Sequence, residues 1–347
     1  MKKLLKNAVS ILLGIIVFAV ALLGVGCFTV PDPEKEASLE YKLIDNIHYE
    51  VAGIGTMTDS EIVIPETYET LPVKSISASA FKNCKTLTSI EIGGSVTSIG
   101  ESAFQSCTGL TSAKLGDNVT DIKAFTFNGC TSLETIEIGK EVKSIGESAF
   151  QSCANLLSVE IPDSVKSIGK YVFTGCTKLK NLKLGDSLTK IDTSAFAACS
   201  SLKSVNIPNS VTSFGALVFQ DCTSLENVEL GNSVKGIGES SFSGCTNLSS
   251  ITFGSSLKTI ARFSFNGCRN LTGLEIPASV MFIGDSAFAG CTSLTTVIFE
   301  NTQGWQATFP KADNIQSLST QDLKNHEKAA LYLKNTDYYC LYNWSRA

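Results

Sequence analysis

A 23-residue repeat constrains the fold of this chain more than any other feature of its sequence. Cysteine recurs ten times at that spacing, each time with Phe three residues before it and Leu three residues after it. The ten copies contain no insertion or deletion, which identifies an array of stacked repeats rather than a set of separate domains. The array cysteines are Cys84, Cys107, Cys130, Cys153, Cys176, Cys199, Cys222, Cys245, Cys268 and Cys291.

Each repeat contains a short strand and a tight turn. In the copy that begins at Cys130, Ile136 and Ile138 alternate with polar neighbours, a period that predicts a strand with these two side chains facing inward. Gly or Pro follows and ends the strand. Phe, Cys and Leu at spacings of three fit a helical or 3₁₀ turn with one buried edge. Strands of successive coils are then expected to stack roughly 4.8 Å apart, which requires a constant repeat length.

The motif Phe-x-x-Cys-x-x-Leu-x-x-Ile-x-Ile-Pro/Gly, followed by Val-x-x-Ile-Gly-x-x-Ala-Phe, resembles the BspA-like class of leucine-rich repeat over residues 62–300. The resemblance implies an α/β leucine-rich-repeat solenoid that is curved and right-handed. It implies one short parallel strand per coil and an opposite side that is poor in strands and built of short helical turns. It also implies a bacterial surface protein that adheres to a host protein or a neighbouring cell, an expectation from analogy.

The first 27 residues have the layout of an export signal, with three lysines before an apolar run over residues 8–25. Cys27 follows in Leu-Gly-Val-Gly-Cys, which resembles a bacterial lipobox and predicts acylation of this cysteine. Gly24 departs from that pattern, because a bulky aliphatic residue usually stands there. An uncleaved membrane helix and simple secretion are the alternatives. All three place the array outside the cytoplasm, and the first two anchor it to the cell membrane.

The segments that flank the array are interpreted as a tether and two caps. Residues 28–38 are predicted to be a polar tether, and residues 39–61 a β-hairpin over the first coil. Residues 301–347 are predicted to be a C-terminal cap, with a helix that starts at Ser319 or Thr320 and ends near Lys334. A separate binding tail is the alternative for its aromatic end, which comprises Tyr338, Tyr339, Leu341, Tyr342 and Trp344.

Twelve cysteines in an exported chain raise the question of disulfides. Stacked array cysteines would lie about 5 Å apart at Cα, within bridging range. Each lies between a Phe and a Leu on a buried edge, however, where cysteine behaves as a small hydrophobe. We expect a ladder of buried thiols, with bridges between neighbours as the alternative. No Cys-x-x-Cys spacing occurs and both histidines lie outside the coils, so neither a metal nor another cofactor is expected.

The inventory of reactive residues favours a non-catalytic protein. The repeats contain no histidine, and their serines and threonines fall at repeated turn positions.

Residues 28–347 carry 25 Lys+Arg against 33 Asp+Glu, a net charge of −8 that argues against a nucleic-acid partner. A macromolecular ligand, protein or glycan, is expected instead. A self-associating envelope spacer and a carbohydrate-binding module are the alternative functions.

Two rows of residues are candidates for contact with a ligand. One consists of outward strand positions with mixed charge, for which an ordinary solvated surface is the alternative explanation. The other lies two residues before each repeat Phe, where serine and a large apolar residue alternate from Ser102 onward. If the large groups face outward, they stand roughly 9.6 Å apart and form an apolar stripe. The alternative is that each one leans over the adjacent serine and fills a gap between coils. The charged candidates are Glu91, Lys114, Glu137, Glu160, Lys183, Glu229 and Glu275; the large ones are Phe125, Tyr171, Leu217 and Phe263.

Overall fold

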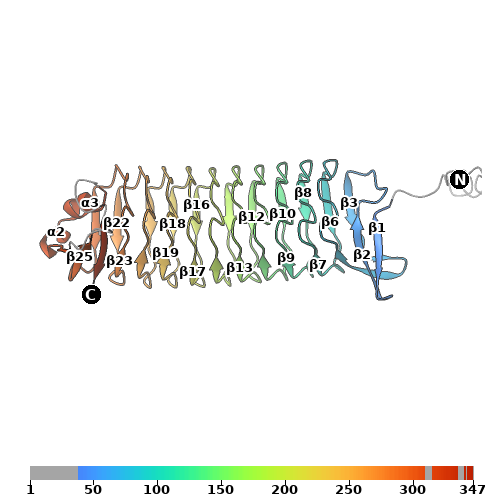
Figure 1. Cartoon of the computed structure of the whole chain (residues 1–347), viewed down its shortest axis with the longest axis horizontal. Coiled ribbons are helices and arrows are strands. Elements are labelled where there is room, and N and C mark those ends of the chain that lie inside the picture. Colours follow the sequence, from blue (N-terminus) through green and yellow to red (C-terminus); the bar gives the residue numbers. More distant parts are fainter. Residues whose placement is uncertain (1–37, 309–314, 335–339, 341, 347) are drawn as a thin grey trace, which may run out of the picture. The chain divides into compact units, whose positions relative to one another are not determined.

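The structure, a computed structural model, describes residues 38–308, 315–334, 340 and 342–346. Residues 39–347 form one compact unit, in which coils of about 23 residues stack side by side as a parallel β-solenoid (Figure 1). The predicted leucine-rich-repeat solenoid is therefore confirmed. The predicted export signal, Cys27 and all of the tether except Ser38 lie outside the described residues.

One side of the solenoid, the long-strand face, carries one strand per coil, as predicted. Neighbouring strands pair in parallel with residues 23 positions apart, so that Ser112 lies opposite both Ser89 and Thr135. The pairing is interrupted three times, between β10 and β12, between β14 and β16, and between β20 and β22. The strands are β3 (Glu61–Ile64), β6 (Ser89–Ile92), β8 (Ser112–Lys114), β10 (Thr135–Glu137), β12 (Ser158–Glu160), β14 (Asn181–Lys183), β16 (Ser204–Asn206), β18 (Asn227–Glu229), β20 (Ser250–Thr252), β22 (Gly273–Ile276) and β24 (Thr296–Phe299).

A second row of strands, the short-strand face, differs from the expectation of one strand per coil. Ser167 and Ile168 pair in parallel with residues of both neighbouring coils. The other coils repeat this arrangement, except that the strand at Phe214 does not pair with the strand at Ile237. Only two residues pair in most coils, which is too short for an alternating pattern to appear in the sequence. The strands are β5 (Leu71–Ile76), β7 (Ser98–Ile99), β9 (Asp121–Ile122), β11 (Ser144–Ile145), β13 (Ser167–Ile168), β15 (Lys190–Ile191), β17 (Ser213–Phe214), β19 (Gly236–Ile237), β21 (Thr259–Ile260) and β23 (Phe282–Ile283).

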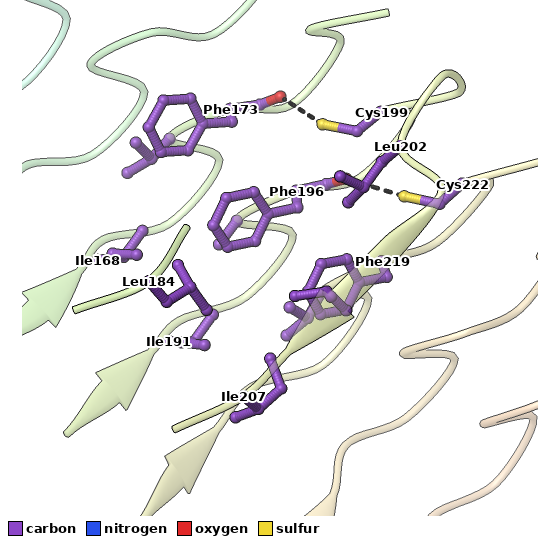
Figure 2. Close-up of a cluster of buried hydrophobic side chains, with 14 of the residues drawn as sticks. Ile168, Phe173, Leu184, Ile191, Phe196, Cys199, Leu202, Ile207, Phe219 and Cys222 are labelled. Carbon is purple, nitrogen blue, oxygen red and sulfur yellow. Dashed lines mark hydrogen bonds between the residues drawn. The ribbon is translucent and has the colours of Figure 1, made fainter. Parts of the chain in front are cut away.

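Phe, Cys and Leu of the repeat form continuous columns inside the solenoid. The rings of Phe173 and Phe196 stack with centroids 5.3 Å apart and planes within 7°, and Phe219 continues the column (Figure 2). Each buried aromatic side chain contributes about 1.5–3 kcal/mol through the water that it excludes. The turn that joins the columns has bonds between residues three apart, such as the Cys199 N–H to the Phe196 carbonyl at 3.3 Å.

The cysteine column consists of free thiols. The eleven described cysteines form no disulfide, and nine of the ten array cysteines are buried, Cys84 being the partly exposed one. The Cys199 and Cys222 thiols donate hydrogen bonds to the carbonyls of Phe173 and Phe196 in the preceding coils, at 3.3 and 3.2 Å (Figure 2). Burial raises the pKa of the Cys176 and Cys222 thiols to about 12, which keeps them protonated at neutral pH.

At the N-terminal end, β1 (Glu40–Ile44) and β2 (His48–Gly53) form an antiparallel hairpin, and β2 pairs with β5. The short strand β4 (Thr67–Tyr68) also pairs with β5. This hairpin extends the short-strand face only, so β3 remains the edge of the long-strand face.

At the C-terminal end, β25 (Trp305–Thr308), β26 (Ile315–Ser317) and β27 (Asn343–Arg346) continue the sheet from β23. The Ser286 N–H donates to the Cys340 carbonyl at 2.6 Å, so the backbone at Cys340 takes the place of a next coil.

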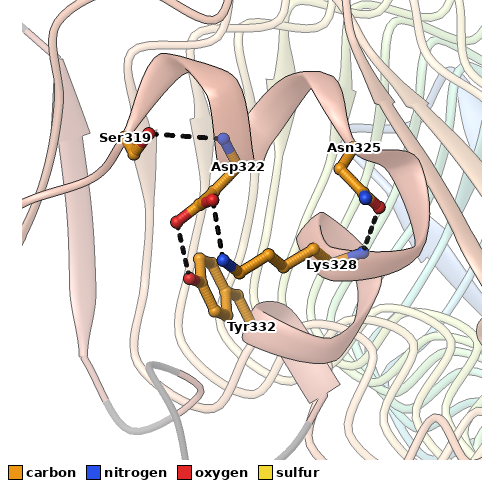
Figure 3. A network of polar contacts seen from close by, with 5 residues as sticks. All are labelled: Ser319, Asp322, Asn325, Lys328 and Tyr332. Atoms are coloured by element: carbon orange, nitrogen blue, oxygen red, sulfur yellow. Dashed lines mark hydrogen bonds and ion pairs between the residues drawn. The ribbon is translucent and has the colours of Figure 1, made fainter.

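The cap contains two helices where one is expected. They are α2 (Thr320–Lys324) and α3 (His326–Lys334), and Asn325 separates them in an extended conformation. The Asn325 side chain accepts the Lys328 N–H and so caps the second helix (Figure 3). Tyr338, Tyr339 and Leu341 lie outside the described residues.

Candidate binding surfaces

The position that alternates between serine and a large residue has a left-handed backbone in every coil, and we call it the left-handed row. Its ten φ values all lie between 53° and 59°. Serine is uncommon in this region, and a bulky residue there is a conformational outlier that costs roughly 1–2 kcal/mol. The row consists of Ser79, Ser102, Phe125, Ser148, Tyr171, Ser194, Leu217, Ser240, Phe263 and Ser286.

Hydrogen bonds between coils hold this backbone in place. The N–H groups of Phe125 and Phe127 donate to carbonyls of the next coil at 2.9 and 2.8 Å, and the other coils follow the same scheme. Each such bond contributes about 0.5–1.5 kcal/mol, which offsets the strain of one left-handed residue. The conformation is therefore a property of the stack, and it is the same whichever side chain occupies the row.

Large side chains of the left-handed row are partly exposed. Tyr171 is 39% exposed, and Phe125, Leu217 and Phe263 are half-buried. The serines between two large residues are covered in part: Ser148 is 3% and Ser194 is 6% exposed, and Ser240 is half-buried. Ser79, whose neighbour in the next coil is another serine, is exposed. The large side chains thus cover neighbouring serines and also present an apolar surface.

The charged row of the long-strand face is exposed and partly self-paired. Lys114 bonds to Glu91 at 2.7 Å, and Lys183 forms the equivalent ion pair with Glu160. The hydrogen bonds that the two lysines donate to these carboxylates raise the pKa of both lysines. Exposed ion pairs such as these add little to stability, as expected of a solvated surface. The remaining candidates of this row are Glu137, Glu229 and Glu275, and none of them forms an ion pair within the described residues.

Two grooves on the long-strand face were not predicted from the sequence. The central groove, of about 310 Å³, lies over β12, β14 and β16, and Leu182 and Lys183 help to line it. The distal groove, of about 370 Å³, lies over β20, β22 and β24, around Gly273. Each spans one of the interruptions in strand pairing. Gly273, which stands where nine other coils carry Ser, Thr or Asn, is the one signal in the sequence that marks such a hollow.

Metal-ligating side chains do not gather in the described part of the chain, where no three His, Cys, Asp or Glu residues lie close enough to share an ion. Among the helices within residues 38–308, 315–334, 340 and 342–346, none has the length and apolar character needed to cross a membrane.

Several solved structures resemble this chain. A leucine-rich repeat protein from Bacteroides ovatus is 26% identical, and the match covers 75% of this chain and 92% of that one with a TM-score of 0.46. A leucine-rich cell surface protein from Faecalibacterium prausnitzii is also 26% identical, with 77% and 94% covered and a TM-score of 0.39. A leucine-rich repeat protein from T. pallidum is 23% identical, with 74% and 87% covered and a TM-score of 0.38. No curated protein matches the chain.

The repeat itself matches a family model described as a BspA type leucine rich repeat region. The match extends over residues 60–176, 143–242 and 218–335, which together include the whole array and much of the C-terminal cap. The motif on which the resemblance was based, and the stacked coils that it forms, lie within these residues. The chain therefore belongs to the BspA-type leucine-rich-repeat family.

Proposed function

We propose that this chain is a non-catalytic binding protein of the bacterial cell surface, which presents its solenoid to a protein ligand. Membership of a leucine-rich-repeat family supports a role for the array in binding. The export signal and lipobox pattern in the sequence support attachment to the membrane through Cys27.

The observation that carries this proposal is the apolar stripe formed by Phe125, Tyr171, Leu217 and Phe263. The coils that carry serine in the left-handed row have the same backbone, so the stack does not need a large side chain there. Large residues recur in every second coil. The ring spacing of the Phe column indicates that they stand about 10 Å apart. Exposed aromatic and aliphatic groups at regular intervals suit a long, extended polypeptide, because aromatic anchors dominate protein interfaces.

The test replaces three members of the stripe by the residue that the alternate coils carry. The full-length chain, purified in detergent, is applied to an array of extracellular matrix proteins and to a glycan array. We expect binding to at least one matrix protein, and a loss of tenfold or more in the triple variant Phe125→Ser, Tyr171→Ser, Phe263→Ser. Glu141→Gln, at an exposed carboxylate outside both candidate rows, is the control. Unchanged binding by the triple variant would contradict the role of the stripe, and self-association without any ligand would favour a spacer.

The distal groove favours carbohydrate binding as a second candidate function. Hydroxyls of Ser250, Thr252 and Thr296 line it together with the Glu275 carboxylate and the ring of Phe253. Hydroxyl and carboxylate groups around an apolar ring can bond to sugar hydroxyls while the ring packs against the sugar face. Binding to neutral glycans that is lost in Phe253→Leu would support this candidate.

A further inference from the structure

We propose that the central groove binds an acidic segment of a polypeptide in which carboxylates flank an apolar residue. This adds a second contact site, with its own ligand chemistry, to the binding function proposed above, and so rests on it. Three features support this assignment: two lysines that form no ion pair in the described part of the chain, an apolar floor and the polar groups beside it.

Two lysines supply positive charge at this groove. Lys180 lines it, and Lys203 occupies the same place in the next coil, directly before the lining residue Ser204. Both side chains are exposed, and neither takes part in an ion pair within the described residues. Coils here are about 5.3 Å apart, as the stacked rings of the Phe column show. Two ammonium groups at this spacing repel each other unless an anion lies between them.

Neighbouring charges confine this cationic site to the two lysines. Lys183 also lines the groove, but its ammonium is held by Glu160. In the row that contains Lys180 and Lys203, Leu157 stands one coil before and Glu226 one coil after. The unpaired positive charge therefore spans two coils, which matches one or two carboxylates better than a long polyanion.

The floor of the groove is apolar. Leu182 faces inward from β14 but is half-buried, whereas the equivalent residues Val159 and Val205 on either side are buried. Pairing stops between β14 and β16, and the exposed part of Leu182 opens into the groove at this break. Leu157, beside Lys180 in the same row, is 40% exposed. A ligand that offers only anionic groups would leave this apolar surface in water, whereas an apolar side chain between carboxylates would cover it.

Polar groups complete the lining. The Ser158 and Ser204 hydroxyls and the Asn181 amide lie across three successive coils and can donate and accept hydrogen bonds. A peptide backbone offers donors and acceptors that these groups can match. The lining contains no aromatic ring, in contrast to the distal groove, which disfavours a sugar here.

The test uses the full-length chain in detergent and a fluorescent peptide with the sequence Glu-Leu-Glu-Glu-Leu-Glu. Its Gln-for-Glu analogue and a sulfated heparin oligosaccharide are the comparison probes. We expect the acidic peptide to bind with an affinity that falls as salt rises, and to bind at least tenfold more weakly to the variant K180E/K203E. The control K143E/K166E makes the same change of net charge at two exposed lysines with the same 23-residue spacing beside the short-strand face. It is expected to bind within twofold of the unsubstituted chain, and Leu182→Ala to bind more weakly.

Equal losses in K180E/K203E and K143E/K166E would overturn the inference, because attraction would then depend only on net charge. Equal affinity for the Gln analogue, or tighter binding of the heparin oligosaccharide, would overturn it as well. Its failure is distinguishable from failure of the proposed function. In the first case a matrix protein still binds, and K180E/K203E has no effect on it; in the second case no matrix protein binds at all.

Discussion

The thiol of Cys222 donates a hydrogen bond to the main-chain carbonyl of Phe196, 3.2 Å away in the preceding coil. The same bond joins each array cysteine from Cys107 to Cys291 to the Phe that stands 26 residues earlier. The Phe196 carbonyl oxygen also accepts a hydrogen bond from the Cys199 N–H, at 3.3 Å. The Cys222 thiol therefore donates to the second lone pair of this oxygen. Cysteine therefore combines the size of a small hydrophobe with a donor that a buried carbonyl can use.

Removing this donor should destabilise the solenoid. Cys222→Ala leaves a small cavity and an under-bonded carbonyl, and we expect the free energy of unfolding to fall by about 1–2 kcal/mol. Urea unfolding followed by circular dichroism measures the change. Cys222→Val fills the space without a donor and is expected to be less stable than the unsubstituted chain. A valine variant of equal stability would show that the thiol acts only by its volume.

Thiol reactivity should depend on position in the stack. Cys84 belongs to the first coil, has no preceding repeat Phe to bond to, and is partly exposed. The pKa of Cys176 and Cys222 is raised by burial to about 12, so the thiolate fraction at pH 8 is about one part in ten thousand. Iodoacetamide at pH 8, followed by peptide mass spectrometry, is expected to label Cys84 first among the array cysteines. Labelling in urea, where all should react, is the control; equal native rates along the array would contradict the prediction.

The sequence was sufficient to predict the solenoid, because one inserted residue would have reversed the inner and outer sides of a strand. The constant spacing of Phe, Cys and Leu thus determined the stacked columns. The second strand of each coil was missed, since a pair such as Ser167 and Ile168 is too short to show a period. Asn325 was likewise not recognised as a helix boundary, although a polar residue that caps the following helix is a known signal.

The candidate surfaces were predicted less completely than the fold. The alternation of serine with large residues was visible in the sequence, but the left-handed backbone of that row was not. Serine and Phe give no hint of a positive φ, which is usually marked by Gly or Asn. The central groove depends on where strand pairing stops between β14 and β16, and the repeat motif is unbroken at that point.

The strain of the left-handed row can be measured at Ser79. Its φ is 59° and its side chain is exposed, so replacement by glycine removes strain with little loss of packing. We expect Ser79→Gly to raise the free energy of unfolding by about 0.5 kcal/mol, after the larger entropy of unfolded glycine is subtracted. Ala78→Gly is the matched control: Ala78 is exposed and not left-handed, so the change should destabilise by about 0.5–1 kcal/mol. If both substitutions changed the free energy of unfolding in the same direction, the left-handed backbone at Ser79 would not be strained.

The C-terminal cap should depend on pH through Asp322. Its carboxylate accepts hydrogen bonds from the Lys328 ammonium at 2.7 Å and the Tyr332 hydroxyl at 2.9 Å (Figure 3). These bonds, the one from Lys328 foremost, hold the pKa of Asp322 below its usual value of 3.8. The unfolded cap therefore binds the proton more tightly than the folded cap. The stabilisation is complete above pH 3.8 and is lost as the pH falls through the lower pKa of the folded state.

Tryptophan fluorescence can follow the cap alone, because both tryptophans of the chain, Trp305 and Trp344, are buried there. We expect the urea midpoint of this signal to be lower at pH 3 than at pH 6, and Asp322→Asn to reduce the difference. Glu327→Gln removes an exposed carboxylate on the same pair of helices and should leave the difference unchanged. If Asp322→Asn retained the full difference between the two pH values, the network of Asp322, Lys328 and Tyr332 would not be the group that couples cap stability to pH.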